Sequence, residues 1–64
     1  MVKINGELMD FAGRTIREYL DETDYNIRLI AVERNGEIVQ KCDFDSVVLS
    51  DGDVLEIVSF VGGG

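Results

Sequence analysis

The sequence contains no histidine and only one cysteine, Cys42. One cysteine cannot form a disulfide within the chain, whereas small secreted domains of this size usually carry several. The first residues do not have the pattern of a signal peptide, and no apolar run is long enough to span a membrane. We therefore expect the chain to act in a reduced, cytoplasmic compartment.

Basic residues are also few, because six Lys and Arg stand against 13 Asp and Glu, a net charge of −7. Nucleic-acid binding needs cations that neutralise phosphates, so this composition argues against a nucleic-acid partner. The acidity fits either steering toward a basic protein or solubility alone. A chain of 64 residues builds one small domain without the walls of a deep catalytic cleft. We therefore expect a protein that is not itself an enzyme.

The first hairpin is predicted from Asn5-Gly6. This pair favours a type I′ turn, in which both central residues adopt positive φ. Apolar and polar residues alternate at 2–4, and a return strand is predicted at 7–11.

A helix is predicted to begin at Thr15. Thr15 and Glu18 have the T-x-x-E spacing of a capping box, in which each side chain binds a free backbone N–H group. Apolar residues then recur at helical spacing on one face, and the helix is expected to end near Asp24. The apolar face consists of Ile16, Tyr19 and Leu20.

A second hairpin is predicted around Asn35-Gly36, between a strand within residues 28–34 and a short return strand at 37–39. Residues 41–50 are irregular, with three side chains available to fill the core: Phe44, Val47 and Leu49.

The last strand is expected at residues 54–61, after a turn at 51–53. Strands separated by a helix favour a right-handed crossover and a parallel pair. The predicted fold is therefore α+β, with a mixed sheet of four to five strands and one helix across one face. This is the β-grasp arrangement.

The sequence ends in Gly62, Gly63 and Gly64. We predict a domain at residues 1–61 followed by a flexible glycine tail at 62–64; a frayed terminus or an added segment is the alternative. A terminal carboxylate can attack the α-phosphate of ATP, and a sulfur or nitrogen nucleophile can then displace the adenylate. Glycines lack Cβ and can thread a narrow channel, with a reach of about 10 Å for three residues.

A partner-binding patch is predicted on the last strand. Leu55 and Ile57 are expected to face the helix, which leaves Val58 and Phe60 exposed beside Glu56 and next to the tail. The alternative is that loop residues such as Phe44 cover this patch.

Other reactive residues are expected to have no chemical role. Cys42 lies without a histidine that could activate it, so we expect no sulfur relay through this thiol. Paired carboxylates could suggest calcium binding or glycosidase chemistry, but turn chemistry explains them better and no metal site is expected. These pairs are Asp43 with Asp45 and Asp51 with Asp53.

Together these motifs resemble the ThiS family of sulfur carriers, within the ubiquitin-like β-grasp proteins. The resemblance covers the whole chain and rests on five segments: the hairpin at Asn5-Gly6, the helix from Thr15 to Leu20, the hairpin from Ala31 to Val39, Asp51-Gly52-Asp53 with the strand that follows, and the Phe60-Val61-Gly62-Gly63-Gly64 end.

The resemblance implies that a ThiF-like adenylyltransferase adenylates Gly64. A sulfur donor system of the cysteine desulfurase or rhodanese type would then form a thiocarboxylate, from which a ThiG-like thiazole synthase takes sulfur for thiamin. It also implies that the carrier holds no cofactor and is a monomer when free. The alternatives are a sulfur carrier for molybdopterin or cysteine biosynthesis, a ubiquitin-like protein modifier, or a binding module with an inert tail.

Overall fold

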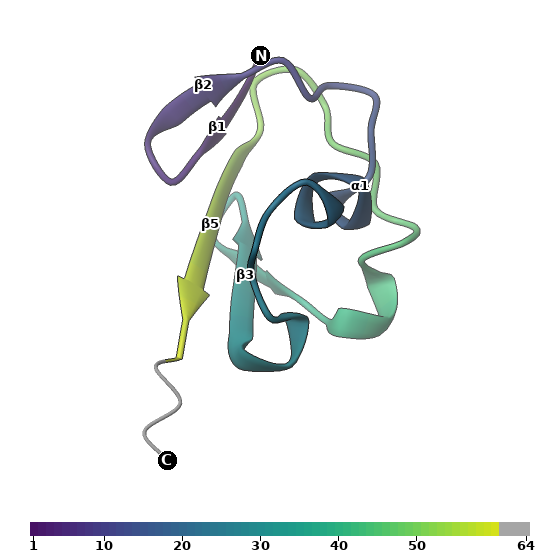
Figure 1. Cartoon of the computed structure of the whole chain (residues 1–64). Helices are drawn as coiled ribbons and strands as arrows, with labels where there is room; N and C mark the ends of the chain where they lie inside the picture. Colours follow the sequence, from purple (N-terminus) through teal and green to yellow (C-terminus); the bar gives the residue numbers. More distant parts are fainter. Residues whose placement is uncertain (61–64) are drawn as a thin grey trace.

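Residues 1–60 are described by this computed structural model, and they form five strands, one α-helix and two 3₁₀ turns (Figure 1). Their bounds are β1 (Val2–Ile4), β2 (Glu7–Met9), α1 (Ile16–Asp21), η1 (Ile27–Leu29), β3 (Ile30–Arg34), β4 (Glu37–Val39), η2 (Lys41–Asp43) and β5 (Val54–Ser59). The strands make one sheet in the order β2-β1-β5-β3-β4. The prediction of a mixed sheet with one helix is confirmed.

Both hairpins turn at their Asn-Gly pairs. The φ angles are 48° at Asn5 and 52° at Asn35, and the glycine that follows each has a φ of 87°. These positive angles fit the predicted type I′ turns. The return strand β2 is shorter than predicted, because it ends at Met9 and the side chain of Phe11 turns into the core.

The last strand, β5, lies between the two hairpins. It runs parallel to β1 and antiparallel to β3. We expected a parallel pair between strands that the helix separates in the sequence. The parallel pair in the structure consists of the first and last strands, β1 and β5. The two strands that directly flank α1, β2 and β3, are separated in the sheet by β1 and β5. β5 was also predicted to be longer: it ends at Ser59, and Val61 lies outside the described residues.

The helix begins as the capping box predicts. The Thr15 hydroxyl oxygen accepts a hydrogen bond from the Glu18 N–H at 3.1 Å, and the Glu18 carboxylate accepts one from the Thr15 N–H at 2.9 Å. This bond from the Thr15 backbone is the main reason that the pKa of Glu18 lies below its ordinary value.

The helix ends at Asp21, three residues before the predicted position near Asp24. The Thr23 hydroxyl donates to the Leu20 carbonyl oxygen at 2.8 Å, and the Thr23 N–H donates to the same oxygen. A threonine that binds a nearby carbonyl in this way competes with continuation of the helix.

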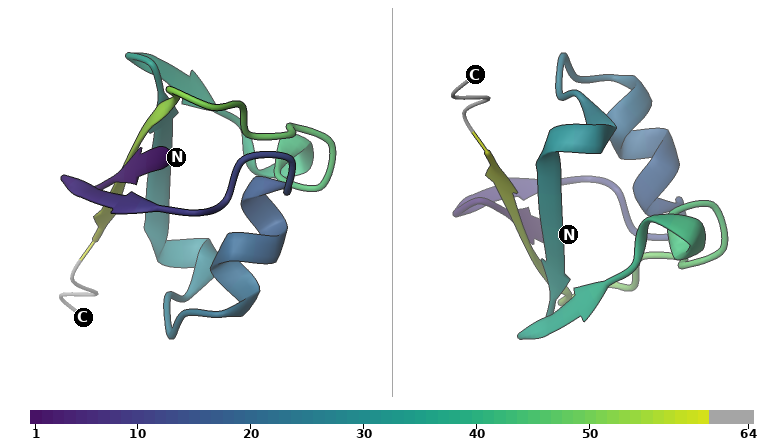
Figure 2. Two further views of the ribbon diagram at one scale, coloured as in Figure 1. Left: turned by 90° about the horizontal axis from the view of Figure 1, so that it is seen from above. Right: turned by 90° about the horizontal axis from the view of Figure 1, so that it is seen from below.

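The core lies between α1 and one face of the sheet (Figure 2). Ile16 and Leu20 of the helix are buried against residues from β1, β3 and β5. As predicted, the long segment after β4 contributes Phe44 and Leu49 as buried side chains and Val47 as a partly buried one. The buried sheet and loop residues are Val2, Ile4, Phe11, Ile30, Val32, Phe44, Leu49, Leu55 and Ile57.

One charged side chain, Asp53, is buried at the start of β5, with only 8% of its surface exposed. Its carboxylate accepts hydrogen bonds from the Arg34 guanidinium at 2.9 Å, the Asn35 amide at 3.0 Å and the Ser50 N–H at 2.8 Å. Burial alone would raise the pKa of Asp53, but these three donors together hold it below its ordinary value. Asp53 therefore ties the second hairpin to β5.

We predict that Asp53→Asn lowers the free energy of unfolding at pH 7 by about 1.5–3 kcal/mol, since it removes hydrogen bonds to a charged acceptor. Because the pKa of Asp53 is lowered in the folded state, its carboxylate contributes fully to the free energy of unfolding above pH 3.8, its ordinary pKa. This contribution is lost as the pH falls through the lower pKa of the folded protein. Urea unfolding between pH 7 and pH 2.5 should therefore show the two proteins converging at low pH.

The matched control is Asp10→Asn, which removes the charge of an exposed carboxylate. It should stay within about 0.5 kcal/mol of the wild type at neutral pH. A gap between wild type and Asp53→Asn that is constant at every pH would contradict the account.

Candidate functional site

The predicted modification site, Gly64, follows β5 in the sequence. Gly64 and the two tail residues before it, Gly62 and Gly63, are outside the residues that the structure describes. The role of Gly64 therefore stays a prediction. What the structure describes is the strand that leads to this segment and the surfaces on either side of it (Figure 1).

Side chains from both Asn-Gly turns hold β5 in place. The Asn5 carboxamide oxygen accepts from the Ile57 N–H at 2.7 Å, and its NH₂ group donates to the Ile57 carbonyl at 3.1 Å. At the other end, the Asn35 oxygen accepts from the Val54 N–H at 2.9 Å. Asn5 thus acts like one more residue of the neighbouring strand, because it binds both backbone groups of Ile57.

The end of β5 is also anchored on its other side. The Phe60 N–H donates to the Leu29 carbonyl oxygen at 2.6 Å, so the ladder with β3 continues one residue beyond the strand and into η1. The described end of the chain, at Phe60, is therefore fixed by bonds from β5 to Asn5 on one side and to η1 on the other.

The predicted phase of β5 is correct. Leu55 and Ile57 are buried, while Glu56 is exposed and Val58 and Phe60 keep 52% and 56% of their surface. Phe44, which could have covered this surface, is buried in the core instead. The three predicted patch residues therefore share an open surface along β5 and at its end, and their role in partner binding stays a prediction.

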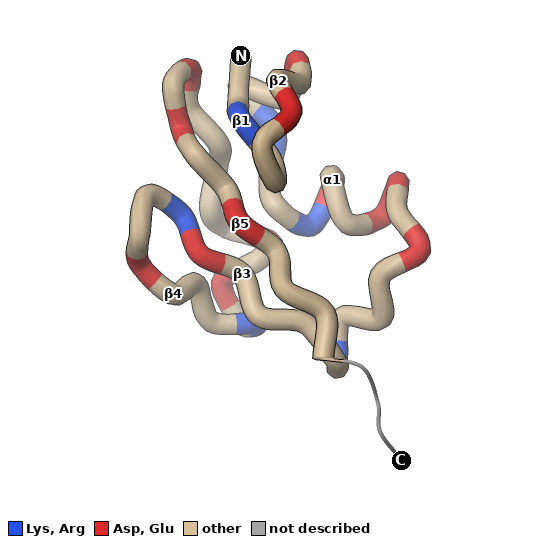
Figure 3. Tube along the Cα trace, turned by 90° about the vertical axis from the view of Figure 1, so that its left-hand side faces the viewer, with Lys and Arg blue, Asp and Glu red and all other residues tan. Residues whose placement is uncertain are grey.

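The apolar surface is wider than the sequence indicated. We define the open-face patch as the exposed apolar side chains that the strands themselves place on the uncovered face of the sheet: Leu8, Ile38, Val54 and Val58. The register places Lys3 between Leu8 and Val54, and Glu33 between Glu56 and Ile38. Figure 3 looks onto these strands and shows the uncharged positions with charged ones between them. Sequence reasoning missed Leu8 and Ile38, although each is the central residue of its short hairpin strand.

The remaining candidate residues are not brought together. Cys42 is exposed, and its sulfur lies 4.0 Å from the Gln40 amide oxygen and 3.9 Å from the Asp43 carboxylate. Asp45 and Asp51 pair with Arg17 and with the amino terminus. Within residues 1–60, no group of three His, Cys, Asp or Glu side chains could hold a metal ion. In the same part of the chain, no helix combines the length and the apolar character needed to cross a membrane.

The mixed five-stranded sheet with a helix across one face defines the class, a ubiquitin-like β-grasp protein. A solved structure of a thiamine biosynthesis protein, ThiS, from Geobacter metallireducens superposes with a TM-score of 0.78. It is 31% identical, and the match covers 98% of this chain and 97% of that one. A model of the ThiS family matches residues 2–64. The chain belongs to the ThiS family.

Curated relatives agree with this assignment. The sulfur carrier protein ThiS of Bacillus subtilis is 39% identical over 66 residues, and that of Thermus thermophilus is 36% identical over 64. Both matches span the full length of both proteins. A thiazole synthase of Paramagnetospirillum magneticum is 50% identical over 62 residues, which are 95% of this chain but 19% of that protein. This chain thus resembles two carriers in full and only a segment of the larger enzyme.

We predict that Val58→Glu changes the free energy of unfolding by less than about 1 kcal/mol, because the new charge stays in water. Ile57→Glu, one residue away, should cost about 3 kcal/mol or more, because it places a carboxylate among buried apolar side chains. Urea denaturation of the two variants checks the strand phase. Equal losses of stability would mean that Val58 belongs to the core.

Proposed function

We propose that this chain is a sulfur carrier that delivers sulfur for the thiazole of thiamin. The observation that carries the proposal is the match, over the full length of both proteins, to the two curated sulfur carrier proteins named above. The proposal also agrees with the match of the ThiS family model to residues 2–64.

In this proposal the Gly64 carboxylate is the working group. One of its oxygens attacks the α-phosphorus of ATP, and pyrophosphate leaves. A persulfide sulfur of the donor system then attacks the acyl carbon, and AMP leaves, which gives an acyl disulfide. A donor thiol attacks the sulfur bonded to the donor protein, so that a disulfide forms there and a thiocarboxylate stays on Gly64.

The catalytic machinery then belongs to partners. A ThiF-like adenylyltransferase binds the ATP, and a cysteine desulfurase or rhodanese-type system supplies the sulfur. A ThiG-like thiazole synthase accepts it. Support for the last partner comes from two proteins named thiazole synthase, from Paramagnetospirillum magneticum and Magnetococcus marinus, each of which contains a segment that resembles almost this whole chain. Carrier and acceptor sequences joined in one polypeptide are expected when the two must meet.

The surface around β5 supplies the recognition. Gly62 and Gly63 would thread the partner's channel, since residues without Cβ fit where others clash. Val58 and Phe60, with Glu56 beside them, would dock on the enzyme that receives the tail. An exposed apolar surface rimmed by charges is a common feature of protein interaction sites.

The test is incubation with the adenylyltransferase of the same organism, ATP and a persulfide donor, followed by intact-mass and fragment mass spectrometry. We expect one terminal oxygen of Gly64 to be replaced by sulfur. Cys42→Ser should react equally well, because the thiol contacts no group of the β5 region. A variant with one residue added after Gly64 should not react, although its fold is unchanged.

Two results would contradict the proposal. Sulfur found on Cys42 would move the chemistry away from the carboxylate. Normal adenylation of the extended variant would show that the carboxylate of Gly64 is not the group that attacks ATP.

A further inference from the structure

A surface pocket of about 400 Å³ lies beside the end of β5. It is lined by Asp24, Tyr25 and Asn26, from the loop after α1, and by Ser59, the last residue of β5. Ser59 follows Leu55 and Ile57 at intervals of two, so its side chain faces the helix side of the sheet. The pocket therefore lies on the opposite side of β5 from the open-face patch.

Two of the four residues that line this pocket, Tyr25 and Asn26, are held by contacts with the rest of the fold. The ring of Tyr25 packs on the core, and its hydroxyl lies 3.4 Å from the Asn5 amide that also binds Ile57. The Asn26 side chain accepts from the Arg28 N–H at 3.0 Å. Tyr25 and Asn26 are therefore already in place in the free domain, and binding a ligand would cost little conformational entropy at these two residues.

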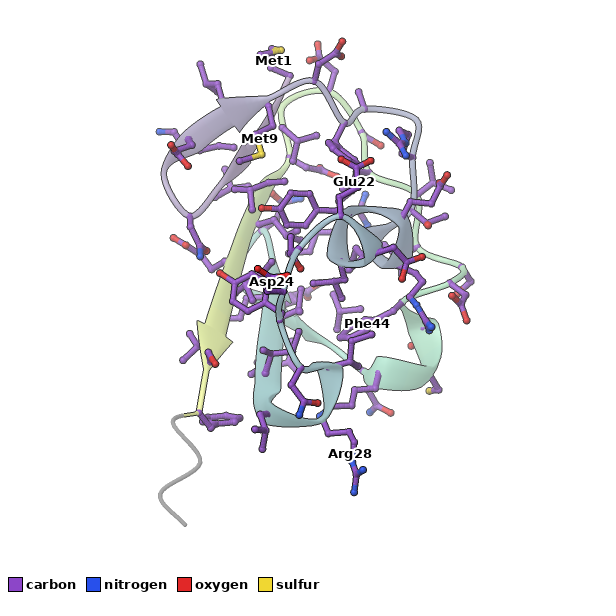
Figure 4. The ribbon with its side chains drawn as sticks, in the orientation of Figure 1. Met1, Met9, Glu22, Asp24, Arg28 and Phe44 are labelled. Atoms are coloured by element: carbon purple, nitrogen blue, oxygen red, sulfur yellow. The ribbon has the colours of Figure 1, made fainter. Side chains whose placement is uncertain are left out.

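The charge in the pocket is unbalanced. Asp21 and Glu22, just before it, form ion pairs with Arg17 and Arg14, but Asp24 forms none with any residue from 1 to 60. Arg28 extends away from Asp24 (Figure 4). An exposed carboxylate beside an aromatic ring and a serine hydroxyl matches a guanidinium group. Such a group binds carboxylates with two parallel hydrogen bonds and stacks on aromatic rings.

We propose that this pocket receives an arginine side chain of the enzyme that adenylates the carrier. This inference rests on the proposed function, because it assigns a second contact to the same encounter. An enzyme that binds the triphosphate of ATP places cationic groups around its site, and the approaching carrier has a net charge of −7. The enzyme would then contact β5 on both faces, through its arginine in the pocket and through an apolar contact with Val58 on the other face. These two contacts would set the direction in which the tail enters the enzyme.

The test compares two variants that lose the same charge at opposite ends of the sheet, Asp24→Asn and Asp10→Asn. Asp10 follows Met9, which pairs with Val2 at the start of β1. Because β1 and β5 run parallel, Asp10 lies at the end of the sheet where β5 begins. Titration calorimetry with the adenylyltransferase of the same organism should show Kd about tenfold or more higher for Asp24→Asn, and less than about twofold higher for Asp10→Asn. Thermal unfolding of both variants should match the wild type.

A second measurement needs no partner. In NMR titrations with N-acetyl-arginine amide, the amide signals of Asn26 and Ser59 should shift in the wild type and in Asp10→Asn, but not in Asp24→Asn. The same titration with N-acetyl-lysine amide should give smaller shifts, because an ammonium neither stacks on the ring nor binds the carboxylate through two parallel bonds.

The outcomes are separable. Equal loss of affinity in Asp24→Asn and Asp10→Asn would overturn the pocket and leave the proposed function intact, since it would show only general attraction between charges. If the wild-type chain is never adenylated by an enzyme that does adenylate another carrier, both the pocket proposal and the proposed function are overturned.

Discussion

The insertion of β5 between β1 and β3 is the arrangement on which the rest of this structure depends. It joins the two hairpins into one sheet, brings Leu55 and Ile57 into the core, and leaves Val58 on the open face. The turn side chains Asn5 and Asn35 bind the backbone of this strand near its two ends, so the hairpins that form locally also hold the long-range pairing. In a chain of 64 residues with a small core, such bonds add to the ladders that β5 forms with β1 and β3 and to the burial of its apolar side chains.

The parts of the fold that local chemistry determines could be predicted from the sequence. The two Asn-Gly turns and the capping box of Thr15 and Glu18 depend on neighbours within a few residues. The phase of Leu55 and Ile57 was predicted from the turn before β5 together with the family resemblance. The structure alone could reveal the bonds from Asn5 to Ile57 and the buried carboxylate of Asp53, since these depend on segments far apart in the sequence. The early end of the helix depends on one threonine hydroxyl whose bonding the helical period does not encode.

The candidate site divides in the same way. The glycine tail and the exposed end of β5 were found from composition and alternation, whereas Leu8 and Ile38 were missed because β2 and β4 are too short to show a clear period. The pocket at Asp24 could not be found from the sequence, because its fourth lining residue, Ser59, comes 33 positions after Asn26 and meets the loop only in the folded sheet. In the proposed function the partners perform the catalysis, and this chain is selected through its surfaces, so the two faces of β5 carry the specificity.

The central claim is that the chain supplies sulfur for thiazole formation, and the most direct test starts from purified thiocarboxylate so that activation is bypassed. The thiocarboxylate is offered in parallel to the thiazole synthase of the same organism and to a molybdopterin synthase catalytic subunit, and sulfur transfer is followed by loss of the thiocarboxylate and by product mass. The account predicts transfer to the thiazole synthase and none to molybdopterin synthase. Transfer to molybdopterin synthase alone would contradict it.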